Sequence, residues 1–199
     1  MSPLRSLRLL AALACMVSAG LRAQSVLFVG NSFTFMPRTA GIGVVDNLNK
    51  GPATGVPAVF QALAAAVGKT PAVSMEAVGG KNLEFHYTKR RELIDKPWDI
   101  VVLQDYSTGP LIENGKRTSY DSFRSNLKNL RDLLVAQNPA VKIWLYATWA
   151  RPDYVKKGRF GASMEAMQAD LHRTFSEAAK DFALQGWVPV GDAFRSAVQ

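Results

Sequence analysis

Residues 25–32 read Ser-Val-Leu-Phe-Val-Gly-Asn-Ser, and this stretch decides the fold. Its apolar, β-branched run without polar alternation is typical of a strand that is buried on both faces of a parallel sheet. Gly30 permits a tight turn at the end of this strand, and Asn31 can hold such a turn through local hydrogen bonds. Ser32 is therefore expected at the carboxyl end of the sheet, where its local pattern fits two roles equally well: an accessible hydroxyl or the N-cap of a helix.

Strands and helices alternate along the rest of the chain. Further strands are predicted at residues 73–78, 99–104, 142–148 and 187–190, and residues 41–55 are interpreted as a loop. Helices are predicted at residues 57–67, 83–94, 119–135, 163–184 and 192–198. Buried strands joined by helices indicate a three-layer α/β/α fold of the flavodoxin-like kind, with about five parallel strands. In such sheets ligands bind beyond the carboxyl ends of the strands, so function is sought in the residues that follow each strand.

The first 23 residues have the pattern of a secretory signal peptide. Arg5 and Arg8 precede a short apolar run, residues 9–17, and small residues lead to a cleavage site expected after Ala23. The run is too short to span a bilayer comfortably, so no stable membrane insertion is expected once the signal is removed. Lipidation at Cys15 is the alternative, although the three residues before this cysteine fit a lipoprotein signal poorly. We therefore expect a periplasmic or secreted protein.

Composition indicates one globular domain, residues 24–199. Apolar residues make up 48% of the chain and charged residues 20%, which argues against a disordered protein. A single cysteine excludes a disulfide framework, and two histidines leave little room for a metal centre. Removal of the signal peptide takes away three arginines and lowers the formal net charge from +8 to +5. The remaining basic residues are scattered, so we expect a solvated surface and no nucleic-acid partner.

Two further strand ends carry groups that suit acyl transfer. Gly79 and Gly80 leave backbone N–H groups open to a ligand, with a plain turn as the alternative. Gln104 ends an apolar strand, so its amide is expected either to donate to a developing oxyanion or to tie down a neighbouring loop. A hydroxyl, a glycine N–H and an amide from three strand ends form an acyl-transfer constellation that still needs its base.

These motifs resemble those of the SGNH (GDSL-like) hydrolase superfamily, in a bacterial branch whose first block is Gly-Asn-Ser-Phe-Thr, here residues 30–34. The second and third blocks resemble residues 79–86 and 101–107, and the resemblance runs from about Ser25 to the end of the chain. It implies a three-layer α/β/α serine ester hydrolase that needs no metal and no organic cofactor.

The resemblance also implies roles for individual residues. Ser32 would be the catalytic nucleophile, and the N–H groups of Ser32 and Gly80 would stabilise the oxyanion. The third block of the superfamily supplies an Asn as the last oxyanion donor. No Asn stands at that position here, so the role passes to Gln104, with Ser107 as a second candidate. Residues that would contact the substrate are Asn31, Gly79, Ser107 and Trp149.

One block of the superfamily, an Asp-x-x-His that supplies the general base and its orienting acid, does not occur in the 199 residues. The resemblance leads us to expect it in a tail beyond Gln199, with a lost activity or a substitute base as the alternatives. Only His86 and His172 could substitute. For His86 the alternatives are a position near the rim of the crevice and, favoured over it, an ordinary half-exposed place on a helix, and His172 is expected away from any strand end. Asp192 is interpreted as a helix N-cap.

The expected function is that of a secreted serine esterase or deacetylase that acts on small-molecule or carbohydrate esters, with acetylated polysaccharides as the leading substrate class. The alternative is a non-catalytic periplasmic module that binds a glycan, with Trp98, Tyr106 and Trp149 as its stacking surface. A nucleotide-binding protein of the flavodoxin kind is a third hypothesis. Residues 32–35 are too bulky and too poor in glycine for its phosphate cradle, and no Gly-x-Gly-x-x-Gly is present.

Overall fold

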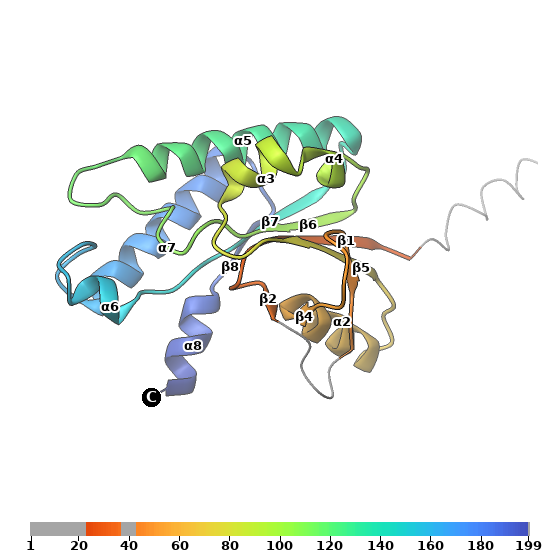
Figure 1. The fold of residues 1–199 in the computed structure, drawn as a ribbon, viewed down its shortest axis with the longest axis horizontal. Coiled ribbons are helices and arrows are strands. Elements are labelled where there is room, and N and C mark those ends of the chain that lie inside the picture. The colour runs from red at the N-terminus through yellow and green to blue at the C-terminus, as the bar shows by residue number, and fades with distance from the viewer. Residues whose placement is uncertain (1–22, 37–42, 199) are drawn as a thin grey trace, which may run out of the picture.

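The computed structural model describes residues 23–36 and 43–198 (Figure 1). Residues 1–22, which hold the expected signal peptide except its last residue and include Cys15, lie outside the described residues. Six parallel strands form the main sheet, in the order β3-β5-β1-β6-β7-β8. Their bounds are β1 (Ser25–Gly30), β3 (Asp46–Asn47), β5 (Ala72–Ala77), β6 (Ile100–Leu103), β7 (Lys142–Tyr146) and β8 (Gly186–Val188). A separate antiparallel ribbon joins β2 (Phe35–Met36) and β4 (Thr54–Gly55).

Helices cover both faces of this sheet, which makes three layers. One face carries α3 (Leu83–Lys89), α4 (Arg91–Ile94), α5 (Thr118–Gln137) and α7 (Met164–Asp181), and the other carries α2 (Val56–Ala66) and α8 (Val190–Val198) (Figure 1). The short α6 (Pro152–Val155) lies in the connection between β7 and α7. Because side chains alternate along β1, Leu27 packs in the core under the larger helical layer and Phe28 in the core against α2.

The α/β architecture predicted from the sequence is confirmed, and each of the five predicted strands and helices is present. The sheet has six strands rather than about five. The extra strand, β3, falls in a stretch predicted as a loop, because its Asp46 and Asn47 are polar and only backbone pairing with β5 makes it a strand. The helix predicted over residues 83–94 is two helices, since Arg90 leaves helical backbone angles between α3 and α4.

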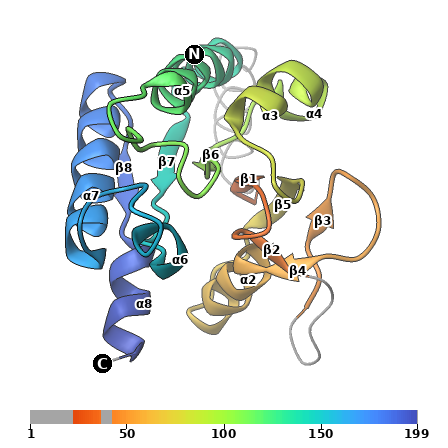
Figure 2. The same cartoon turned by 60° about the vertical axis from the view of Figure 1, so that its left-hand side comes forward.

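The central strand β1 has β5 on one side and β6 on the other (Figure 2). From β1 the chain goes to the edge strand β3, comes back to β5 beside β1, and then crosses to β6 on the other side of β1, so the strand order reverses at β1. Ligands of open α/β sheets bind at such a reversal, beyond the carboxyl ends of the strands. The turns that follow β1, β5 and β6 are therefore the place to look for a site.

No helix within residues 23–36 and 43–198 combines the length and the apolar character that a membrane span requires.

Candidate active site

Ser32 lies on a tight turn directly after β1. The carbonyl of Asn31 accepts the N–H groups of Thr34 at 2.8 Å and Phe35 at 3.1 Å. The side-chain oxygen of Asn31 accepts the N–H of Phe33 at 3.1 Å, which closes the turn as local Asn bonding does. The turn leads into β2 and not into a helix, so Ser32 is no N-cap. Ser32 is exposed, and neither its N–H nor its hydroxyl has a hydrogen-bond partner among the described residues.

Gln104 holds the Ser32 turn in place from the interior of the protein. This fully buried side chain accepts the N–H of Asn31 at 3.0 Å and the hydroxyl of Thr34 at 2.8 Å, and its amide nitrogen donates to the carbonyl of Asp105. Both the oxygen and the nitrogen of this amide thus have a partner within the protein. The expected role as an oxyanion donor is not what this geometry shows, because the amide N–H points at a backbone carbonyl; Gln104 ties down the loop instead.

The turn at Gly79 and Gly80 lies beside the Ser32 turn. Two hydrogen bonds join them: the N–H of Val78 donates to the Gly30 carbonyl at 3.0 Å, and the Asn31 amide donates to the Lys81 carbonyl at 2.8 Å. Gly80 has a φ of 72°, in the left-handed region that favours glycine. Its N–H donates to no acceptor in the described part of the chain, and the residue is exposed. The N–H groups of Ser32 and Gly80, on two neighbouring turns, thus both have no acceptor among the described residues.

The four predicted substrate contacts differ in their exposure. Gly79 is exposed at the turn, as a contact requires. Asn31 is buried, and its amide also donates to the Asp105 carbonyl at 3.3 Å, so it braces the two turns and does not reach a ligand. Ser107 is buried as well, and its hydroxyl has no partner among the described residues. Neither Asn31 nor Ser107 is accessible, because the ends of β1 and β6 pack around them.

Aromatic side chains support the far side of the Ser32 turn. The ring of Trp149 stacks on that of Phe33, with centroids 4.2 Å apart and an angle of 10° between the planes. The hydroxyl of Tyr146 donates to the Phe33 carbonyl at 3.2 Å. Burial raises the pKa of Tyr146 to about 12, so this hydroxyl stays a neutral donor. Trp98, expected in a stacking surface, is buried and donates to the Ile94 carbonyl, so it cannot take part in one.

Sequence reasoning missed Asp105, the residue after Gln104. Its buried carboxylate accepts the N–H of Leu83, the first residue of α3, at 2.7 Å. Burial raises the pKa of Asp105 to about 6, against the opposing effects of N–H bonds from Leu83 and Tyr106 and of the nearby His86. The sequence feature that could have identified Asp105 is its position as a polar residue close after a buried strand.

Neither histidine makes a hydrogen bond with Ser32 within the described residues. His86, expected half-exposed, is fully buried, because its ring pairs with the carboxylate of Glu76 inside the molecule. His172 is half-exposed on α7 and its Nε2 lies 2.8 Å from the carboxylate of Asp192. Asp192 is not an N-cap, since α8 begins two residues before it. The described residues contain no group of three or more His, Cys, Asp or Glu side chains that could hold a metal ion.

Two cavities, both with many polar residues in their walls, flank Tyr106 beyond the end of β6. One, of about 570 Å³, is lined by residues that include Gly80, Asp105 and Ser119. The other, of about 360 Å³, lies on the side of Tyr154 and Arg159. Tyr106 itself is 38% exposed between them. Gly80 thus forms part of the wall of the first cavity.

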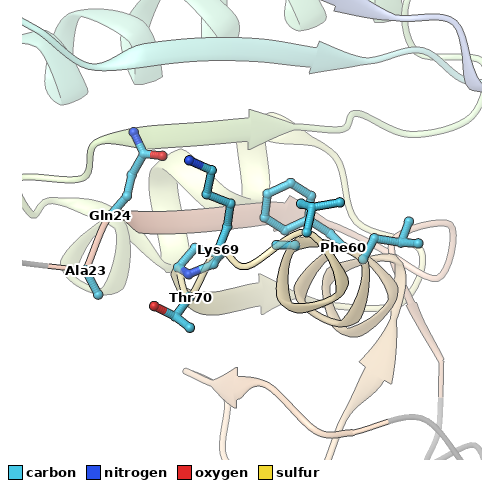
Figure 3. A pocket seen from close by; sticks show the side chains of 9 residues that line it. Ala23, Gln24, Phe60, Lys69 and Thr70 are labelled. Carbon is cyan, nitrogen blue, oxygen red and sulfur yellow. The ribbon is translucent and has the colours of Figure 1, made fainter.

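A further cavity of about 650 Å³ lies at the opposite end of β1 (Figure 3). Its lining comes from the start of that strand and from α2 and the loop after it, and includes Gln24, Phe60 and Lys69. Because Ser32 follows the carboxyl end of β1 and Gln24 precedes its amino end, this cavity is separate from the candidate site.

Comparisons with known proteins agree with this geometry at the level of the fold. No family model and no curated protein sequence matches the chain. Solved structures do match. A protein from Parabacteroides merdae, described as a GDSL-like lipase, superposes with a TM-score of 0.60 at 15% identity, over 89% of this chain and 82% of that one.

Two esterases superpose nearly as well. The W215I variant of Axe2, an acetyl xylan esterase from Geobacillus stearothermophilus, gives a TM-score of 0.57 at 17% identity, over 88% of this chain and 80% of that one. AlinE4, an SGNH-hydrolase family esterase, gives 0.54 at 15% identity, over 85% and 77%. Agreement along most of each chain, together with the turn after β1 that presents Ser32, shows that this chain has the fold of the SGNH hydrolases.

Proposed function

We propose that the protein is a serine carboxylic ester hydrolase that works through an acyl-enzyme. One observation carries the proposal: Ser32 is exposed after the central strand, and its own N–H and the N–H of Gly80 have no partner among the described residues. A nucleophile beside two unpaired backbone donors is the arrangement that acyl transfer needs, because the donors can meet the negative charge that forms. The SGNH-hydrolase fold is consistent with this chemistry.

The proposed reaction has two halves. Ser32 Oγ attacks the ester carbonyl carbon, its proton passes to a general base, and the carbonyl oxygen becomes an oxyanion that the N–H groups of Ser32 and Gly80 stabilise. The bond from the carbon to the alcohol oxygen then breaks, and the alcohol leaves with the proton. Water attacks the acyl-Ser32 in the same manner and releases the acid. The proposal keeps the expectation that the base is the histidine of an Asp-x-x-His pattern.

The substrate class we propose is an acyl ester of a polar alcohol, such as an acetylated carbohydrate. The cavity that opens beside Gly80 and the second cavity beyond Tyr106 are lined largely by polar side chains, which suits a hydroxyl-rich leaving group. The exposed ring of Tyr106 between the two cavities offers a face on which a sugar can stack. Export, with a cleavable segment that ends near Ala23, remains part of the proposal and is tested by cell fractionation.

The test uses the protein as its gene encodes it, including any residues after Gln199. Hydrolysis of p-nitrophenyl acetate and of acetylated xylo-oligosaccharides is compared between wild type, Ser32→Ala and Ser125→Ala. Ser125 is a matched control, because it is an exposed serine on α5. We expect Ser32→Ala alone to lose hydrolysis and covalent labelling by a fluorophosphonate. Equal hydrolysis by wild type and Ser32→Ala would refute the assignment. Glycan binding by an inactive wild type would favour the binding-module alternative.

A further inference from the structure

A fully buried pair, Glu76 and His86, lies under the candidate site and takes no part in the proposed chemistry. Nδ1 of His86 is hydrogen-bonded to one carboxylate oxygen of Glu76, and both side chains have no exposed surface. The other carboxylate oxygen accepts the amide of Asn49 at 3.2 Å and lies 3.9 Å from Nε of Arg90. Nε2 of His86 is buried and has no partner among the described residues.

Such a pair is costly to bury. The free-energy cost of removing two polar or charged groups from water is offset only when the two groups interact in good geometry. An apolar pair of similar volume is often as stable. The ring nitrogen Nε2 adds to the cost, because a buried polar atom without a partner loses its hydration. A gain in stability therefore does not explain why Glu76 and His86 are buried together. Their position in the fold offers another explanation.

The pair spans the ends of the turn that carries Gly80. Glu76 is the fifth residue of β5, and His86 is the fourth residue of α3, so the segment of residues 77–85 between them is closed across its base. Within that segment, Val78 is bonded to Gly30 and Lys81 to Asn31. These bonds hold both sides of the turn but leave Gly80 itself in open space, with nothing within 4 Å of an added Cβ.

A second carboxylate fixes the same helix from the other neighbouring strand. Asp105, after β6, accepts the N–H of Leu83, one turn before His86. Since β5 and β6 lie on either side of β1, the start of α3 is held from both sides above the strand that delivers Ser32. Shifting His86 would tilt α3 about the Asp105 bond and move the turn before it.

We infer that Glu76 and His86 are positioning residues that set the direction of the Gly80 N–H relative to Ser32. This inference rests on the proposed function for its catalytic meaning, but the position of the turn can be measured without any activity. The pair acts through the turn and touches no substrate, since it has no exposed surface.

The variants are chosen to separate positioning from stability. His86→Asn places a carboxamide nitrogen near the position of Nδ1 and so keeps a donor for Glu76. His86→Leu removes the donor, and Glu76→Gln keeps the shape but changes the carboxylate into an amide. The double variant Glu76→Leu/His86→Leu replaces the pair by apolar groups, although it also removes the carboxylate oxygen that faces Asn49 and Arg90. Asp99→Asn is the control. Asp99 accepts both the N–H and the hydroxyl of Ser25, at the amino end of β1 and so at the other end of the strands from the candidate site.

Two measurements are made on each variant. In ¹⁵N NMR spectra of the chain, we expect the Gly80 amide signal to shift and broaden in His86→Leu and in the double variant. It should stay near its wild-type position in His86→Asn and Asp99→Asn. In the ester-hydrolysis assay we expect kcat to fall about 10–100-fold in the first two variants with KM little changed, because a misdirected oxyanion donor weakens only the transition state.

The outcomes distinguish the two proposals. If the folded double variant keeps the wild-type Gly80 signal and the wild-type kcat, the positioning role is wrong. If His86→Leu does not fold, Glu76→Gln and the double variant decide by the same measurements. A wild-type protein without Ser32-dependent hydrolysis would defeat the proposed function, while the Gly80 signal would still decide whether the pair directs the turn.

Discussion

The side-chain oxygen of Gln104 accepts the backbone N–H of Asn31 at 3.0 Å, so the residue after β6 holds the residue just before the proposed nucleophile. The same oxygen accepts the Thr34 hydroxyl, and the amide nitrogen donates to the Asp105 carbonyl. One buried amide thus joins the start and the end of the Ser32 turn to the neighbouring strand. A carboxamide meets this demand because it offers both an acceptor and a donor.

Gln104→Glu tests this relationship with almost no change in shape. A carboxylate can still accept from Asn31 and Thr34, but its second oxygen would face the Asp105 carbonyl, and two acceptors repel each other. We expect the unfolding free energy to fall by about 1–3 kcal/mol at neutral pH, as for a buried polar group left without its partner. Urea unfolding at pH 7 and pH 4 checks this. The deficit should shrink at pH 4, where protonation restores a donor, and an equal deficit at both values would contradict the assignment.

Gly30→Ala tests how closely this turn is packed. A Cβ on Gly30 would lie 2.7 Å from the Gln104 side-chain oxygen and closer still to the Thr34 hydroxyl. Because both atoms are fixed by hydrogen bonds, we expect a loss of about 1–3 kcal/mol in unfolding free energy from overpacking. Gly79→Ala is the control, since a Cβ there meets nothing within 4 Å. Thermal unfolding measures both, and a similar effect at the two glycines would show that the turn yields easily.

Much of this arrangement could be predicted from sequence, for a physical reason. The run at residues 25–30 is apolar throughout, and such a run is stable only inside a sheet, so β1 and the position of Ser32 after it follow directly. The paired glycines likewise indicated a turn with an accessible N–H. The role of Gln104 was left between two possibilities, because a single amide suits a ligand and a loop equally well until its partners are known.

The buried pair could not be predicted in the same way. Glu76 lies in a strand and His86 in a helix. In the sequence, each alone looks like an ordinary polar residue of a strand or a helix. Their contact depends on the angle at which α3 packs across β5, which local sequence patterns do not encode. The available signal was a carboxylate within the apolar run at residues 72–77, where an unpaired charge would be too costly to bury.

Asp105 predicts a dependence of stability on pH. Its pKa in the folded protein, about 6, lies above the ordinary value of 3.8, so the folded state binds this proton more tightly than the unfolded state. The stabilising contribution is therefore complete below pH 4 and is lost as the pH rises to about 6, at a cost of about 3 kcal/mol. Urea unfolding of wild type and Asp105→Asn at several pH values measures it.

The comparison between these two proteins isolates the contribution of Asp105 from that of other groups. The unfolding free energy of Asp105→Asn relative to wild type should rise between pH 4 and pH 7, because the amide cannot ionise while it can still accept from Leu83. A difference that stays constant over this range would mean that the folded pKa of Asp105 is near its ordinary value.

His172→Ala tests whether the second histidine serves as the base. His172 pairs with Asp192 at the carboxyl end of β8, and β8 lies three strands from β1. Within the described residues His172 and Asp192 contact each other and make no contact with Ser32, whereas a base must approach its hydroxyl within about 3 Å. We expect His172→Ala to keep the rate of ester hydrolysis and to lose less than about 1 kcal/mol of stability, as for a half-exposed polar contact. Asp192→Asn should behave in the same way. A hundredfold fall in kcat in both variants, with the fold intact by circular dichroism, would place the base on α7 and end the expectation of an Asp-x-x-His.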